Sequence, residues 1–149
     1  MFHRLLPVVI CILGQQASAQ TCEGSAVACV RVLACIGNAG LFVDGAAFGA
    51  GQGTLMLTRS DNVGCIGTWD SDGPFGAGIA HMRCDDGLSG RVLYHTQDNA
   101  TGTVIGVGED SQGRTIQAWS GTNVLNFLSE TGTPETARLP CSTAPLPMS

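Results

Sequence analysis

From Gly40 to about Trp119 the chain alternates between short apolar runs and clusters of turn residues. Clusters such as Asp70-Ser71-Asp72-Gly73-Pro74 recur every 10 to 12 residues. Gly accepts positive φ, Asp and Asn bond their own backbone, and Pro presets φ, so these clusters reverse the chain. We therefore expect a mainly β fold, an antiparallel meander of hairpins punctuated by glycine, because a βαβ fold would need long helical crossovers. The predicted strands are Leu41 to Val43, Thr54 to Thr58, Gly64 to Trp69, Gly78 to Cys84, Arg91 to His95, Thr103 to Val107 and Thr115 to Trp119.

Glycines within this region repeat at a fixed interval. Gly51-Gln52-Gly53 is followed by Asp61, and 25 residues later Gly76-Ala77-Gly78 is followed by Asp86. A period of this size indicates one supersecondary unit that is used more than once. The same offset relates Leu57 to Met82, Val63 to Leu88 and Trp69 to Tyr94.

The hairpin around Pro74 and Phe75 has a register that can be predicted. Facing residues in an antiparallel hairpin share a constant sum of residue numbers. A turn centred between Pro74 and Phe75 gives a sum of 149, which places Cys65 opposite Cys84. Opposed positions in a non-hydrogen-bonded pair lie within reach of a disulfide, so we predict a Cys65–Cys84 bond. The same register pairs Gly67 with Met82 and Trp69 with Ala80.

The segments that flank this region are less regular. Ser25 is a suitable cap for a short N-terminal helix over residues 25–36, although three valines keep a strand open as the alternative. Residues 123–128 form either a final strand or a helical turn. The tail, residues 129–149, is rich in Thr, Pro and Ser, so we expect it to lack regular structure and to be tethered by Cys141.

The N-terminus has the composition of an export signal. Met1 to Arg4 is positively charged, Leu5 to Leu13 is apolar at all but one position, and Ala17-Ser18-Ala19 fits the small-x-small cleavage pattern. The apolar run is too short to cross about 30 Å of hydrocarbon, which argues against an uncleaved anchor. We expect residues 1–19 to be a signal peptide that is cleaved after Ala19, and residues 20–128 to form a single β domain in the periplasm or outside the cell.

The mature chain contains an even number of cysteines, which predicts a disulfide framework in an exported protein of this size. No pair has the C-x-x-C spacing of a redox motif or a metal knuckle. If Cys65 and Cys84 pair, the other four can pair in three ways. The six cysteines are Cys22, Cys29, Cys35, Cys65, Cys84 and Cys141.

The charge of the chain excludes several classes of function. The formal net charge is −5, and removal of Arg4 with the signal peptide makes it −6. A surface of this charge repels nucleic acid and anionic membranes, because neither finds a basic patch. The chain also contains no lysine, which excludes Schiff-base and lysine-base chemistry.

From Cys65 to Gly87 the chain reads Cys-x-Gly-x-Trp, followed by Gly73, by Gly76-x-Gly78 and by Asp86-Gly87. This segment resembles the MORN repeat, whose units read aromatic-x-Gly-x-Trp, Gly, Gly-x-Gly and Asp-Gly. Cys65 replaces the aromatic residue, and Asp86-Gly87 comes about two residues late. The resemblance implies short hairpins stacked into an elongated sheet, and a scaffold or binding role rather than catalysis.

Acidic residues in two turns are candidate interaction sites. Asp70-Ser71-Asp72-Gly73 begins like a calcium loop, but His81 occupies the position of the bidentate Glu in an EF-hand. A turn is the simpler interpretation, and a weak calcium site at Asp70, Asp72 or Asp85-Asp86 stays open. We therefore identify Asp70, Asp72, Asp85 and Asp86 as candidate interaction loops and expect no cofactor.

The sequence offers little support for catalysis. Alternation along a strand places Met82 in the core and His81 in solvent, and His95 beside Tyr94 is interpreted in the same way. Ser89 lacks the Gly-x-Ser-x-Gly elbow of a nucleophile. We expect the two tryptophans and the single tyrosine to belong to the core rather than to a ligand platform; they are Trp69, Trp119 and Tyr94.

Together these features predict an exported, non-catalytic binding, scaffold or accessory protein of the cell envelope. The expected partner is another envelope protein, and the oligomeric state is left open. An alternative is a small inhibitor of an envelope-attacking hydrolase, whose acidic loops would meet a basic enzyme. A minimal hydrolase that uses His81 or His95 is a second alternative.

Overall fold

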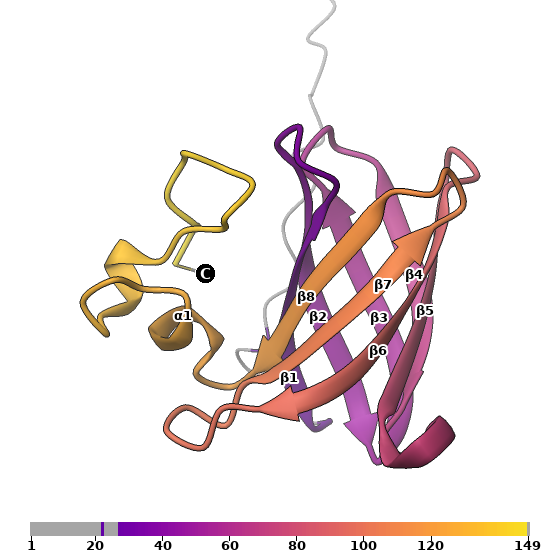
Figure 1. Ribbon diagram of the computed structural model, residues 1–149, viewed down its shortest axis with the longest axis horizontal. Coiled ribbons are helices and arrows are strands. Elements are labelled where there is room, and N and C mark those ends of the chain that lie inside the picture. Colours follow the sequence, from indigo (N-terminus) through magenta and orange to yellow (C-terminus); the bar gives the residue numbers. More distant parts are fainter. Residues whose placement is uncertain (1–21, 23–26, 149) are drawn as a thin grey trace, which may run out of the picture.

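The strands form a closed antiparallel barrel in the computed structural model, which describes residue 22 and residues 27–148 (Figure 1). Each strand pairs with the next one in sequence, and β8 returns to pair with β1. A helical turn, α1 (Val124–Phe127), follows β8, and two short 3-10 segments are η1 (Pro74–Gly76) and η2 (Pro134–Thr136). The strands are β1 (Cys29–Ile36), β2 (Leu41–Ala50), β3 (Gln52–Arg59), β4 (Gly64–Asp70), β5 (Gly78–Cys84), β6 (Ser89–Gln97), β7 (Val104–Asp110) and β8 (Thr115–Gly121).

The predicted antiparallel meander is confirmed, and the structure adds that the meander closes on itself. The largest difference in strand length is in β2, which was expected to end at Val43 and continues to Ala50. Its extension pairs with β1 on one side and with β3 on the other, so its backbone groups are satisfied despite Asp44 and Gly45. For residues 123–128, the helical turn rather than the strand is the correct alternative.

The prediction of an N-terminal helix over residues 25–36 is wrong. Cys29–Ile36 is strand β1, and residues 23–26 lie outside the described part of the chain. β1 pairs with β2 along one edge and with β8 along the other. Without it, the barrel would have two open edges, so long-range pairing outweighs the weak local preference for a helix.

The Cys65–Cys84 disulfide and its hairpin register are both confirmed. Cys65 faces Cys84, and the same register pairs Gly67 with Met82 and Trp69 with Ala80. The other two disulfides are Cys22–Cys29 and Cys35–Cys141. The second of these tethers the C-terminal segment to β1, as expected for Cys141. That segment is not wholly irregular, because it contains η2 and two isolated β-bridges.

Large and small residues alternate around the barrel interior. Tyr94 on β6 lies between Gly78 on β5 and Gly106 on β7, and Trp69 on β4 lies between Gly53 and Ala80. A narrow barrel has room for a large inward side chain only where its cross-strand neighbours are small. The repeated glycines therefore provide the space that the inward aromatic residues occupy.

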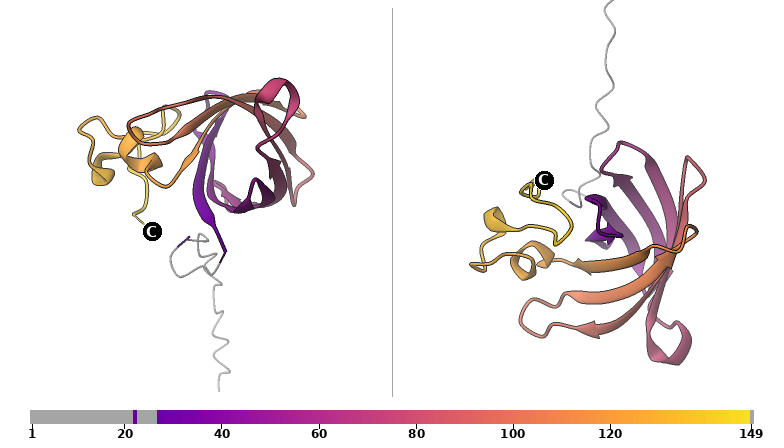
Figure 2. Two further views of the ribbon diagram at one scale, coloured as in Figure 1. Left: turned by 90° about the horizontal axis from the view of Figure 1, so that it is seen from below. Right: turned by 45° about the horizontal axis from the view of Figure 1, so that its top comes forward.

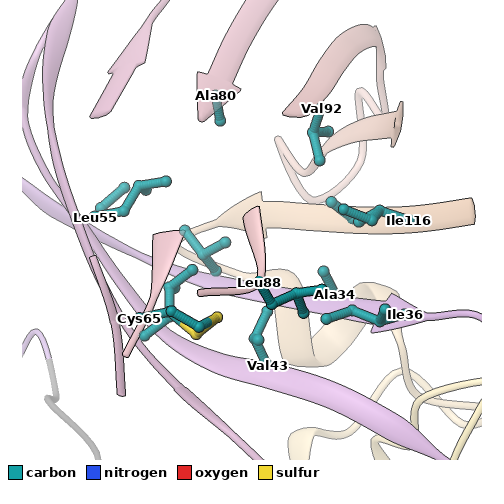
Figure 3. Packing of buried hydrophobic residues seen from close by; sticks show 14 residues of the cluster. Ala34, Ile36, Val43, Leu55, Cys65, Ala80, Leu88, Val92 and Ile116 are labelled. Atoms are coloured by element: carbon teal, nitrogen blue, oxygen red, sulfur yellow. A yellow bond between two sulfur atoms is a disulfide. The ribbon is translucent and has the colours of Figure 1, made fainter. Parts of the chain in front are cut away.

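Buried apolar residues form two clusters. One fills the barrel interior with side chains from several strands, as Figure 3 shows for Ala34, Val43, Val92 and Ile116. The other lies on the outside of the barrel, where Leu33 and Trp119 pack against the C-terminal segment. Figure 2 shows this segment lying beside the barrel in both views. Within the described residues, no helix is long and apolar enough to cross a membrane.

Candidate functional site

The two ends of the barrel differ, and one of them is closed by side chains. The Cys65–Cys84 disulfide and Leu88 are buried there (Figure 3). Arg59, at the end of β3, is also buried; its Nε donates to Asp61 Oδ1 at 2.7 Å and its Nη2 donates to Asp86 Oδ2 at 2.6 Å. These hydrogen bonds lower the pKa of both carboxyl groups. Arg59 thus joins the β3–β4 and β5–β6 connections across this end.

The opposite end contains a cavity of about 520 Å³ that is lined by residues from all eight strands. We call it the mouth; the left view of Figure 2 looks at the barrel from this end. Its deepest residues are Val32, Leu55, Ala80 and Tyr94, which also border a void of only about 20 Å³ further in. Below this floor the interior is filled by the apolar cluster. The barrel interior is therefore closed by side chains at one end and open to a cavity at the other.

Trp69 forms part of the mouth wall and is held in place by a hydrogen bond. Its indole Nε1 donates to the carbonyl oxygen of Phe48 at 3.1 Å. A Cβ on Gly53 would lie 3.0 Å from the same nitrogen and 1.7 Å from the Phe48 oxygen, so this position requires glycine. Because the single indole donor is already used, the ring offers the cavity an apolar surface.

Tyr94 provides a polar group at the cavity floor. Its ring lies among interior residues, and it is only half-buried because the cavity leaves part of it accessible. The hydroxyl has no hydrogen-bond partner among the described residues. No fully enclosed side-chain nitrogen or oxygen in the described chain lacks a partner, so this hydroxyl is not fully enclosed, and Tyr94 is one of the residues that line the mouth. Burial raises the pKa of the phenol well above its usual range, which keeps it neutral and able to donate.

The rim of the mouth is polar. His95 follows Tyr94 at a β-bulge that shifts the β6–β7 register, and its Nδ1 lies 3.0 Å from Thr96 Oγ1. Asp98 fixes the neighbouring loop by accepting hydrogen bonds from the Thr101 hydroxyl and amide, which lower the pKa of this carboxyl group.

On the other side of the mouth, Phe75 is fully exposed at the β4–β5 connection with a φ of 60°. Further rim residues are Asp70, Ser71, Gln97 and Ser120.

The structure does not bring the four candidate acidic residues together. Asp70 and Asp72 lie at the mouth, where Asp70 Oδ1 accepts a hydrogen bond from the Asp72 backbone amide at 2.8 Å, as in an ordinary turn. Asp85 and Asp86 lie at the closed end, where Asp86 binds Arg59. No group of three or more potential metal-ligating side chains occurs in the described part of the chain. No described cluster therefore supports the weak calcium site that the turn sequence left open.

The candidate catalytic residues are also apart. His81 is exposed on the outer face of β5 while Met82 packs against the barrel core, as the strand alternation predicted. Ser89 is at the start of β6, near the closed end, whereas His95 lies at the mouth. Neither histidine forms a hydrogen bond to Ser89 or to a carboxylate of a described residue.

Trp69 and Tyr94 are the cavity residues that sequence reasoning missed. Both were expected in the core, and both do contact the core cluster, but they also line the mouth. The signal was present in the glycine pattern, because Gly53 and Gly78 are the cross-strand neighbours of these two rings. The glycine pattern does not show that the sheet closes into a barrel, and only this closure makes the inward-facing rings part of a cavity wall.

Comparisons with known proteins identify the fold and no family. No protein-family model matches the chain, and no curated protein matches it. A solved structure of a de novo designed, fluorescence-activating β-barrel is similar, with a TM-score of 0.50 and 13% identity over 64% of this chain and 92% of that chain. This similarity supports the barrel fold alone. The resemblance to MORN repeats stays untested, and the closed barrel differs from the elongated sheet that it implied.

Proposed function

We propose that this protein is a non-catalytic binding protein that holds a small amphipathic molecule in the mouth of its barrel. The mouth carries this proposal, because it combines apolar walls from Val30, Ala47 and Leu55 with a polar rim. Its volume of about 520 Å³ lies in the range typical of small-molecule sites, roughly 300–1,000 Å³. Eight-stranded barrels have an interior that is filled by side chains or holds one small ligand.

The disulfides indicate where such a protein works. The described chain contains three of them, which is typical of proteins in an oxidising compartment outside the cytoplasm. In our proposal the N-terminal residues 1–19 direct export, and the mature protein serves the cell envelope as a carrier or an accessory binding protein. The partner in this proposal is a small molecule rather than the envelope protein that the sequence led us to expect.

The two tryptophans allow a direct test, because they lie in different places. Trp69 lines the mouth, and Trp119 lies in the cluster outside the barrel. The probe is 11-bromo-1-undecanol, whose bromine quenches tryptophan fluorescence at close range. In the Trp119→Phe variant, in which Trp69 is the reporter, we expect saturable quenching with a Kd on the order of 10–100 µM for a ligand of this size.

Two further variants control for non-specific adsorption. In Trp69→Phe, in which Trp119 is the reporter, we expect no saturable quenching. Gly78→Leu in the Trp119→Phe background places a side chain in the mouth; there is room, since a Cβ there would meet its nearest atom at 3.5 Å. We expect this variant to fold and to lose most of the quenching. Equal quenching of both tryptophans, or quenching that Gly78→Leu leaves unchanged, would contradict a site in the mouth.

A further inference from the structure

The ionisable groups of the mouth are unevenly distributed in depth. Asp70 and His95 line it at the rim, and no arginine lines it among the residues that the structure describes. The sequence contains no lysine. A molecule that enters the mouth therefore meets no permanent positive charge on the described wall, and it passes a carboxylate at the rim.

The floor offers one neutral polar group. Val32, Leu55 and Ala80 are apolar, so the Tyr94 hydroxyl is the hydrogen-bonding side chain among the described floor residues. Gly78 and Gly106, on either side of Tyr94, carry no side chain that could cover it. A hydroxyl, ether or carbonyl oxygen that reaches the floor can accept the hydrogen bond that this phenol has not given to the protein.

A negative charge would be disfavoured at the same depth. A carboxylate could also accept the Tyr94 hydrogen bond, but one hydrogen bond does not replace the hydration that a buried charge loses, whereas a neutral acceptor is satisfied by it. The raised pKa of the Tyr94 phenol has the same cause, because burial opposes the formation of the phenolate anion. Binding of a carboxylate group at the floor is thus unfavourable, although a long apolar tail could pack against the walls of the mouth.

We propose that the mouth selects uncharged amphiphiles over anionic ones and binds them with the hydrogen-bonding end inserted against the Tyr94 hydroxyl. This inference rests on the proposed function, since it names the class of ligand that the same site takes. Fatty alcohols, methyl esters of fatty acids and other neutral molecules of similar shape belong to this class, and free fatty acids at neutral pH do not. The opposite orientation, with the polar end in water at the rim, would make the charge of that end nearly irrelevant.

The test compares three molecules with the same brominated chain: 11-bromo-1-undecanol, methyl 11-bromoundecanoate and 11-bromoundecanoate. Each is titrated at pH 8, where the acid is fully ionised, into the Trp119→Phe variant. We expect the alcohol and the ester to quench Trp69 with a Kd at least tenfold lower than that of the carboxylate. The ester separates the effect of charge from that of the carbonyl group.

Tyr94→Phe in the same background tests the orientation. It removes a hydroxyl that bonds no described residue, so the melting temperature should be unchanged. We expect it to raise the Kd of the alcohol roughly fivefold, as for the loss of one hydrogen bond, and to leave the Kd of the carboxylate unchanged. Equal affinity for alcohol and carboxylate, or an alcohol affinity that Tyr94→Phe does not change, would overturn the inference while the proposed function stands. Absence of quenching by all three molecules would instead overturn both.

Discussion

Gly108 and Gly78 both face the barrel interior, but the space around them differs. A Cβ on Gly108 would lie 1.8 Å from the Arg91 carbonyl oxygen, which belongs to the backbone of the neighbouring strand. A Cβ on Gly78 would meet its nearest atom, Tyr94 Cβ, at 3.5 Å, which is an ordinary contact. Among these glycines, then, some allow strands to approach each other closely and others leave room for a side chain or a ligand.

We expect Gly108→Ala to lower the free energy of unfolding by about 1–3 kcal/mol, because the strands must separate to admit the methyl group. Gly78→Ala should leave the stability unchanged or raise it slightly, since alanine restricts the unfolded chain more than glycine does. Urea unfolding of the two variants with intact disulfides measures the difference. Equal losses of stability in both variants would show that the close approach at Gly108 does not constrain the fold.

At the scale of elements, the bridge from Arg59 to Asp61 and Asp86 joins two connections at the closed end. Its hydrogen bonds lower the pKa of both carboxyl groups in the folded protein. A group with a lowered folded pKa contributes stability above its unfolded pKa, about 3.9 for Asp, and loses this contribution as the pH falls through the folded value. We therefore expect the stability of the protein to decrease as the pH falls below about 4.

Asp86→Asn should make this decrease shallower, because one of the two titrating partners of Arg59 is removed. Asp85→Asn is the matched control: it removes the same charge one residue away, from a carboxyl group that does not bind Arg59. Urea unfolding at a series of pH values between about 5 and 2 provides the slopes, across the range in which aspartates titrate. An identical slope for wild type and Asp86→Asn would refute a role for the bridge in acid sensitivity.

The elements that could be predicted are those specified by nearby residues. The turn at Pro74 and Phe75 fixes the β4–β5 register, so the Cys65–Cys84 bond followed from residue numbers alone. β1 could not be predicted in the same way, because its strand conformation depends on pairing with β8 from the far end of the barrel sequence. The mouth was missed for a related reason: its wall collects residues from every strand, and only closure brings them together.

At the scale of the whole molecule, the protein is a barrel that is closed at one end and contains a cavity at the other. The disulfide, Leu88 and the Arg59 bridge close one end, and the C-terminal segment covers the outer faces of Leu33 and Trp119. No described residue of that segment lines the mouth. The acidic turn residues that stood out in the sequence lie at opposite ends and mark turns rather than a shared site. The turns could therefore be predicted from local sequence, while the cavity emerges from the arrangement of all eight strands.

Locating the bromine of 11-bromo-1-undecanol tests most directly whether the mouth holds a small neutral molecule. Crystals of the protein grown with this alcohol would give an anomalous difference map at the bromine absorption edge. We predict a bromine peak at the rim, near Ser71 and Gln97, with the chain running inward toward Tyr94. A peak confined to the outer face of the barrel, over the exposed side chains of Ile66 and Val107, or no peak in the mouth at saturating alcohol, would contradict this placement.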